Sequence, residues 1–417
     1  MEKLISKNKK LEYIWNNPFL HPTYLDNKNM NPPGNKISVV VATYNRAPYS
    51  SSMLHDNPLS WALSSILSQK KCNLGEIIII DDGSFDYTGE TVNYYKKKGE
   101  QKDIEIKYIK NKKNEGLPSS LNKGVENSCF DYIFFIDDDC ILGDYSLFGA
   151  LYSMNETNKS DSNIALMHIP VYTRTNLPLG LIPIDEIGKV DFENTIVTNN
   201  NHLFPEEYLS LFKDVFLDNE LKILKPIEVH NIGGVYLIKK DIFKEAGGIC
   251  EYFKWPNFYG EHTDFSLKLN NLGYNLYLTP DPKFSCIHLK YGCSGKINFL
   301  DVLTSRNNNN FGGHSLEEIV KLSSIPKINS GCRVNMENWS YSKIISHYVI
   351  FSRWDKEVGQ NWKTKIFKEF VEQNLDNFSA PIGKKIMDKK KRKEIWKKAI
   401  IDGNNLLKKI NLNLISV

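Results

Sequence analysis

Strand-like and helix-like patterns alternate along the first part of the chain. Apolar or alternating runs that suit strands occur at Ile37–Thr43, Glu76–Ile80, Ile104–Ile109, Tyr132–Ile136 and Ile164–Ile169. Between them, helical periodicity or composition marks Pro58–Gln69, Thr88–Lys98, Leu117–Glu126 and Tyr145–Asn155. This order predicts βαβ units, and therefore an α/β fold in which helices flank a mainly parallel sheet.

The pattern changes twice further along the chain. Prolines, acids and short apolar clusters in residues 170–230 predict an insertion that lies over the sheet. The α/β pattern then returns, with strands at Gly233–Ile238, Asn275–Leu278 and Phe284–His288 and helices at Lys240–Ala246 and Glu261–Leu272. Beyond residue 296 the candidate elements are helices, at Ser315–Leu322, Ser342–Trp354, Trp362–Asn374 and Gly383–Leu407.

Three parts are therefore expected. Residues 1–35 form an N-terminal arm that ends in the breaker sequence Asn-Pro-Pro-Gly, residues 36–295 form the α/β domain, and residues 296–417 form a helical C-terminal extension. A length of 417 residues accommodates one large domain and a smaller one.

Composition narrows the class of protein. The chain is 41% hydrophobic and 24% charged, as in soluble globular proteins, and its net charge of +4 does not indicate a nucleic-acid partner. The seven cysteines form no CxxC pair, which favours reduced thiols and a cytosolic setting. No apolar run has the length of a signal peptide core or of a membrane span, so we expect a cytoplasmic protein.

One basic run leaves membrane contact open. Residues Lys384–Lys398 carry nine basic residues against two acids. Such a segment can be a basic helix that meets an anionic lipid surface or an anionic acceptor, or simply the solvated face of a helix.

Acidic residues follow two of the predicted strands. Asp137, Asp138 and Asp139 come directly after the strand at Tyr132, and Asp81 and Asp82 close the strand at Glu76. Ligands of open α/β sheets bind at the carboxyl ends of strands, so both acidic groups should face one cleft. A divalent cation with a phosphate behind it would relieve the repulsion among the three adjacent carboxylates. The alternative is that both groups are solvated turns.

The residues of two further segments could either bind a ligand or cap a helix. Asn114-Glu115-Gly116 precedes the helix at Leu117, and Asn122 lies within that helix. Gly116 would let the chain pass close to a ligand and Asn122 offers a carboxamide, but Asn and Gly also cap and turn helices.

Taken in order, these segments resemble a known family. Val39–Asn45, Ile78–Ser84, Asn114–Asn122 and Phe134–Asp139 are similar to the nucleotide-binding half of family-2 glycosyltransferases, which have the GT-A fold. Gly233–Gly248 resembles the acceptor-side strand and helix of that family, and Gly260–Lys268 resembles the start of its catalytic helix. The resemblance covers residues 37–295 and implies a GT-A domain, a Rossmann-like mainly parallel sheet with flanking helices.

The resemblance also implies an activity. It is the metal-dependent, inverting transfer of a sugar, of hexosyl type, from a nucleotide-diphosphate donor to an acceptor hydroxyl, with a UDP-sugar as the expected donor. The expected metal is Mn²⁺ or Mg²⁺, held by a DXD-type motif through Asp139 and by His288. The residues expected at the donor nucleotide are Thr43, Tyr44, Asn45, Asp81, Asp82, Asn114, Gly116, Asn122, Asp137 and Asp138.

The catalytic base is less clearly marked. Inversion needs a base on the face opposite the leaving group, and the candidates are Glu261, His262 and Asp264. The family usually has an Asp directly after the Glu of this helix start, where this chain has His262. The carboxylates of Glu261 and Asp264 could instead only favour the helix dipole, and His288 could be a histidine of the core or of a sheet edge.

Alternative functions differ in the residues they need. A nucleotidyltransferase would need a glycine-rich, arginine-containing loop after the first strand, and an aspartyl phosphatase would need a threonine where Ile141 stands. The main alternative is a catalytically impaired glycosyltransferase-like protein that binds a nucleotide sugar without turnover, a reading that His262 keeps open. The acceptor, whether glycan, lipid-linked, peptide or small molecule, stays open, as does homo-oligomerisation.

Overall fold

The computed structural model describes residues 19, 22–47, 54, 57–173, 178–179, 216–229, 232–253, 260–288, 336–354 and 389–414. Of the predicted segments, most of the N-terminal arm and of the 170–230 insertion lies outside these ranges, as do the helices expected at Ser315–Leu322 and Trp362–Asn374.

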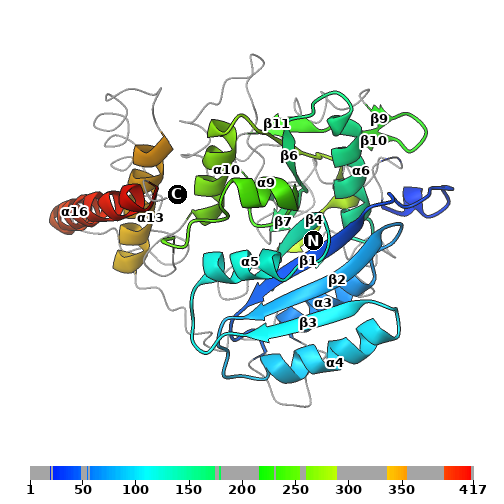
Figure 1. The fold of residues 1–417 in the computed structure, drawn as a ribbon, viewed down its shortest axis with the longest axis horizontal. Coiled ribbons are helices and arrows are strands. Elements are labelled where there is room, and N and C mark those ends of the chain that lie inside the picture. The colour runs from blue at the N-terminus through cyan, green and yellow to red at the C-terminus, as the bar shows by residue number, and fades with distance from the viewer. Residues whose placement is uncertain are drawn as a thin grey trace, which may run out of the picture.

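An eight-stranded sheet forms the centre of the molecule (Figure 1). Its spatial order is β11-β13-β6-β12-β4-β1-β2-β3. The strands span β1 Lys36–Thr43, β2 Asn73–Asp81, β3 Glu105–Lys110, β4 Tyr132–Asp137, β6 Ile164–His168, β11 Ile227–Val229, β12 Tyr236–Lys239 and β13 Asn275–Leu278. β1 to β4 run parallel to one another and β6 runs parallel to β13, whereas β12 and β11 are antiparallel to their neighbours. The predicted mainly parallel sheet is thus confirmed.

Helices cover both faces of the sheet, which explains the continuous apolar runs of its central strands. α3 (Pro58–Leu67), α4 (Thr88–Glu100) and α6 (Ser146–Asn158) pack on one face, and α5 (Leu117–Glu126), α9 (Lys240–Glu245) and α10 (Glu261–Asn271) pack on the other. Successive residues of β1 alternate between the two cores: Val39 and Val41 enter the first, and Val40 and Ala42 enter the second.

A close approach between helix and sheet depends on one glycine. A Cβ added at Gly124 in α5 would lie 2.3 Å from Cγ1 of Val40 in β1. No real Cβ contact is that short, so glycine lets α5 lie directly on the strand that ends beside the acidic residues.

A smaller sheet lies beyond the carboxyl end of β4. Its order is β5-β14-β7-β8, with β5 at Cys140–Leu142, β14 at Cys286–His288, β7 at Val171–Thr173 and β8 at Pro178–Leu179. The prediction of a strand at Phe284–His288 is partly wrong. The strand begins at Cys286, because Pro282–Phe284 forms a 3-10 helix, η5, that Asp281 caps. A separate hairpin pairs β9 (Phe216–Asp218) with β10 (Ile223–Leu224).

The described N-terminal residues pack against this body. Leu25, in the 3-10 helix η3 (Pro22–Leu25), is buried with Tyr145, Phe148 and Phe284. The ammonium group of Lys283, itself buried, donates hydrogen bonds to the carbonyls of Phe19 and Lys222 and to Asp281.

The described C-terminal part consists of two helices packed together. α13 (Met336–Trp354) and α16 (Lys389–Leu414) share a core that includes Phe253 from the α/β domain, and they stand beside α10 in Figure 1. Each extends past the predicted ends, to Met336 in one case and Leu414 in the other. In the basic run, Lys393, Lys397 and Lys398 are exposed on α16. Among the described residues, no helix is both long and apolar enough to cross a membrane.

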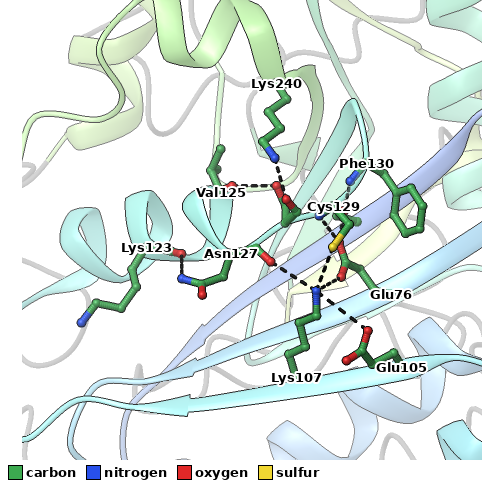
Figure 2. A network of polar contacts seen from close by, with 11 residues as sticks. Glu76, Glu105, Lys107, Lys123, Val125, Asn127, Cys129, Phe130 and Lys240 are labelled. Carbon is green, nitrogen blue, oxygen red and sulfur yellow. Dashed lines mark hydrogen bonds and ion pairs between the residues drawn. The ribbon is translucent and has the colours of Figure 1, made fainter.

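A buried carboxylate joins three strands of the main sheet to the loop before β4, as Figure 2 shows. Glu76 in β2 accepts hydrogen bonds from the Ser38 hydroxyl, the Lys107 ammonium and the backbone N–H of Cys129, each at 2.6 Å. Burial by itself raises the pKa of Glu76, but these donors lower it below its ordinary value. The same pairing raises the pKa of Lys107.

We expect Glu76→Gln to lower the free energy of unfolding by about 1–3 kcal/mol at neutral pH, since it removes the charge that three donors share. A lowered pKa means that the carboxylate stabilises the fold above its unfolded pKa, near 4.5, and that this stabilisation is lost as pH falls through the folded value. The difference between wild type and variant in urea unfolding should therefore vanish in acid.

Glu105→Gln is the matched control. Glu105 lies 3.8 Å from the same ammonium, but its side chain is 66% exposed. Its substitution should change the free energy of unfolding by less than about 0.5 kcal/mol. Equal effects of the two substitutions would show that burial of Glu76 does not determine the stability of this network.

Candidate active site

The two acidic strand ends lie on either side of β1. In the register of the sheet Asp81 is opposite Thr43, and Asp137 is opposite Ala42. Because β1 has β2 on one side and β4 on the other, all three strands deliver their carboxyl ends to one edge.

Arg46 pairs with the acidic cluster. Its Nε donates a hydrogen bond to Oδ1 of Asp138 at 2.8 Å, and its Nη2 lies 3.6 Å from Oδ2 of Asp139. Burial raises the pKa of Asp138 to about 6, against the opposing effect of the guanidinium. Although burial by itself lowers the pKa of Arg46, Asp138 and Asp139 raise it above its ordinary value. Arg46 thus offsets one of the three charges, and it binds the residue in the middle.

Four side chains with metal-ligating atoms converge beside that pair. Nε2 of His288 lies 3.1 Å from Oδ1 of Asp139. One ligand atom each from Asp137, Cys140 and His288 also lie within 4.8 Å of one another. Carboxylate oxygens with an imidazole are suitable ligands for manganese, so the residues present fit the metal that the sequence predicts. The structure brings Asp139 and His288 together as expected and adds a thiol that we did not expect.

Asp81 and Asp82 are both buried, but their carboxylates accept hydrogen bonds from different partners. Asp82 accepts hydrogen bonds from the Asn111 amide at 2.9 Å and from the backbone N–H groups of Glu115 and Gly116 at 2.7 and 2.8 Å. It therefore fixes the Asn114-Glu115-Gly116 turn. Asp81 accepts from the N–H of Ser84 and from the Tyr108 hydroxyl. Its carboxylate lies next to Thr43, where a nucleotide base is expected.

The loop after β1 presents an aromatic pair. Tyr44 and Phe85 meet edge to face with ring centroids 6.3 Å apart, and they are 41% and 83% exposed. Asn45, in the left-handed backbone region, holds the loop by accepting the N–H of Phe85 and by donating its own N–H to the Ser84 hydroxyl. Exposed rings at the rim of a cleft can stack on a planar base.

Asn122 has a different environment from the one predicted. Its amide donates to the carbonyl of Ile249 and to Glu251, and its oxygen accepts the N–H of Ile249. It thus ties α5 to the loop after α9. Gly116, with a φ of 94°, precedes α5 and gives its N–H to Asp82.

The three candidate bases occupy the first turn of α10, after the left-handed residue Gly260. Glu261 accepts the backbone N–H of Gly260 at 3.1 Å, and its other oxygen lies 3.8 Å from Nε2 of His262. Asp264 is fully buried and accepts hydrogen bonds from Arg353 and from the Trp354 indole, all at 2.7 Å. Of the three, Glu261 and His262 retain some exposure, whereas Asp264 is bound by the C-terminal helix α13.

Buried polar groups lie between α10 and the sheet. His168, the Tyr236 hydroxyl and Nδ1 of His262 have no hydrogen-bond partner among the described residues. The rings of Tyr236 and His262 meet edge to face at 5.7 Å. Burial lowers the pKa of His168 to about 3, so this imidazole is neutral. Unpaired buried groups are costly, and a polar atom of a ligand or a water would recover that cost.

Sequence reasoning did not identify Arg46, Cys140, Arg353 and Trp354 as parts of the site. Arg46 and Cys140 directly follow recognised motifs, so their proximity to those motifs was an available signal. Arg353 and Trp354 end a helix in the extension, and no local pattern links them to Asp264.

Parts of this chain are similar to known proteins. The model of a family described as "Glycosyl transferase family 2" matches residues 38–245. TarP of Staphylococcus aureus, a poly(ribitol-phosphate) beta-N-acetylglucosaminyltransferase, is 32% identical over 190 residues, which cover 45% of this chain and 52% of TarP. A poly(ribitol-phosphate) beta-glucosyltransferase of Bacillus spizizenii is 26% identical over 244 residues, 55% of this chain and 36% of that protein. The chain thus spans about half of TarP and less of the second relative.

Among solved structures, S. aureus TarS in complex with UDP-GlcNAc is similar with a TM-score of 0.45 and 16% identity. The match covers 88% of this chain and 80% of that one.

We expect Arg353→Met to lower the free energy of unfolding by about 3–5 kcal/mol, because it leaves the Asp264 carboxylate buried without its cation. Denaturant unfolding measures the loss. Adding Asp264→Asn to Arg353→Met should recover part of it, since no unpaired charge then remains. Additive effects of the two substitutions would contradict a direct interaction.

Proposed function

The chain belongs to glycosyl transferase family 2 through residues 38–245, and on this premise we propose that it is a metal-dependent, inverting glycosyltransferase. It moves a hexose-type sugar from a nucleotide-diphosphate donor, UDP in the first instance, to an acceptor hydroxyl. The observation that carries the proposal is the meeting of Asp139 and His288, 3.1 Å apart, at the sheet edge where Asp81 and Asp137 also end.

The nucleotide would lie along the carboxyl ends of β1, β2 and β4. The base is placed by Thr43, Asp81 and the rings of Tyr44 and Phe85, of which Asp81 can accept the imide N–H of uracil. Asp137 lies nearest the ribose. A Cβ on Gly234 would come within 2.9 Å of its carboxylate, so glycine at that position lets the acceptor-side segment approach Asp137.

Asp139 and His288 would hold the metal against the diphosphate. When bound, Mn²⁺ or Mg²⁺ neutralises the charge that develops on the leaving diphosphate as the glycosidic bond breaks. The Arg46–Asp138 pair keeps the turn that presents Asp139 in place. The buried polar groups of His168 and Tyr236 would receive hydroxyls of the sugar.

We assign the base to Glu261. Its carboxylate accepts one backbone N–H and retains acceptor capacity for the proton of the attacking hydroxyl. Nε2 of His262 lies 3.8 Å from the other carboxylate oxygen. Asp264 already accepts hydrogen bonds from Arg353 and Trp354, and we assign it the role of holding α10 against α13.

The acceptor and partners that we propose come from the chemistry of this chain and from the names of its relatives. Two relatives are named as transferases for poly(ribitol phosphate), which makes that polymer the first acceptor to test. Contact of Lys384–Lys398 with anionic lipid and homo-oligomerisation stay predictions. A binding protein without turnover is the second candidate, and the observation in its favour is His262 where the family usually has Asp.

We expect UDP with Mn²⁺ to raise the melting temperature of the protein by a few degrees. A ligand at about a hundred times its dissociation constant adds roughly 2.7 kcal/mol, which is a shift of that size for a chain this long. Asp139→Asn should abolish the metal-dependent part of the shift in a thermal unfolding assay. Asp144→Asn is the control, because Asp144 pairs with Lys70 outside the cleft. If no nucleoside diphosphate stabilises the protein with either metal, the donor site is wrongly assigned.

We expect Glu261→Gln to lower the rate of sugar transfer by roughly 10²–10⁴-fold, because it removes the proton acceptor. Donor binding should be unchanged, which the thermal shift with UDP checks. Glu251→Gln provides a matched control, since Glu251 is exposed and contacts Asn122. Full activity of Glu261→Gln with loss of activity in His262→Asn would move the base to His262. UDP binding without transfer in the wild type to any screened acceptor would favour the second candidate.

A further inference from the structure

The metal-ligating cluster contains a thiol in addition to its oxygen and imidazole groups. We propose that Asp137, Cys140 and His288 form a site for a thiophilic divalent cation such as Zn²⁺, and that this cation competes with the oxygen-ligated metal of the donor site. Binding of the cation stands on the geometry of these residues alone, and only its effect on sugar transfer rests on the proposed function.

The fold, rather than the flexibility of side chains, brings the three residues together. Cys140 opens β5 directly after the acidic turn, and His288 closes β14 at the position opposite Cys140 in the antiparallel register. Asp137 ends β4 on the other side of the same turn. Directly opposed residues of antiparallel strands have neighbouring side chains, so Cys140 and His288 are held as a pair.

The distances suit a small tetrahedral ion. One ligand atom of each residue lies within 4.8 Å of the other two. Zinc binds sulfur at about 2.3 Å and nitrogen or oxygen at about 2.0–2.2 Å, which places tetrahedral ligands about 3.5 Å apart. Small side-chain rotations would therefore close the site. Three protein ligands leave one position for water or for a phosphate oxygen.

The chemistry of the ligands separates this cation from the donor metal. Mg²⁺ and Mn²⁺ favour carboxylate and phosphate oxygens, whereas a thiolate with an imidazole favours Zn²⁺, which also binds such ligand sets more tightly. Asp139 with His288 forms the first kind of pair, and Cys140 with His288 forms the second. Because both use His288, one imidazole cannot complete the two sites at once, and zinc should inhibit transfer.

The direct test uses the reduced, full-length protein and metals alone. Titration with Co²⁺ or Cd²⁺ should produce the near-ultraviolet charge-transfer absorbance of a metal thiolate, saturating at one metal per chain, and Zn²⁺ should displace the probe. Cys140→Ser should remove the band and weaken zinc binding by roughly 100-fold or more, since loss of an outer-shell partner alone costs roughly 10–100-fold.

Cys72→Ser is the control. Cys72 directly precedes β2, at the amino end of the parallel strands, whereas Cys140 follows the carboxyl end of β4. The band should persist in this variant, whereas equal loss in both variants, or a band that survives in Cys140→Ser, overturns the assignment. Unchanged melting temperatures would establish that both variants fold.

The outcome separates this inference from the proposed function. Thiolate binding of the metal without any nucleotide binding would keep the zinc site and remove the transferase proposal. Nucleotide binding with Mn²⁺ but no thiolate band would do the reverse. If both hold, micromolar zinc should inhibit transfer by the wild type, and Cys140→Ser should resist inhibition at the same concentration.

Discussion

Three carboxylates in succession at the end of a buried strand set the constraint on which the site depends. Asp138 and Asp139 are buried and Asp137 is half-buried, so their mutual repulsion would force protonation or disorder without compensation. Arg46, delivered by the loop after β1, contacts the second and third of them. Asp137 and Asp139 are thereby left as alternate residues on a turn that Arg46 holds.

A second buried ion pair connects α10 to the C-terminal part. Asp264 in the first turn of α10 is held by Arg353 and Trp354 at the end of α13. A Cβ at Gly260, the residue before α10, would lie 2.8 Å from Ile350 of α13. The helical extension therefore determines where Glu261 and His262 stand. This is a structural role for a segment that lies outside residues 38–245.

The sequence was a good guide where one local pattern decided the structure. The strands from Lys36 to Asp137 and the helices between them follow from runs buried on two faces, and the bounds of α5 and β13 were predicted without error. Short strands such as β5 and β11 were missed, because two or three residues carry no period.

The residues of the site divide in the same way. Some are identified by a local sequence pattern, and others are brought together only by packing. The acidic residues and His288 were found from motifs and order. The pairing of Asp139 with His288 was expected. The partners of Asp138 and Asp264 were not found, because they are distant in sequence and are chosen by packing. Asn122 shows the limit most clearly. A carboxamide at a ligand-binding position and one that ties a helix to a loop look identical in a sequence.

Because β14 comes late in the sequence, it determines the stage of synthesis at which Asp139 and His288 can meet. A ribosome has released β1 to β4, the acidic turn and Cys140 long before it reaches His288. These early elements are joined by nearby crossovers and can assemble during synthesis, whereas β14 must return to β5 across a long span of chain. A chain still being made would thus contain its acidic turn before the histidine that meets Asp139.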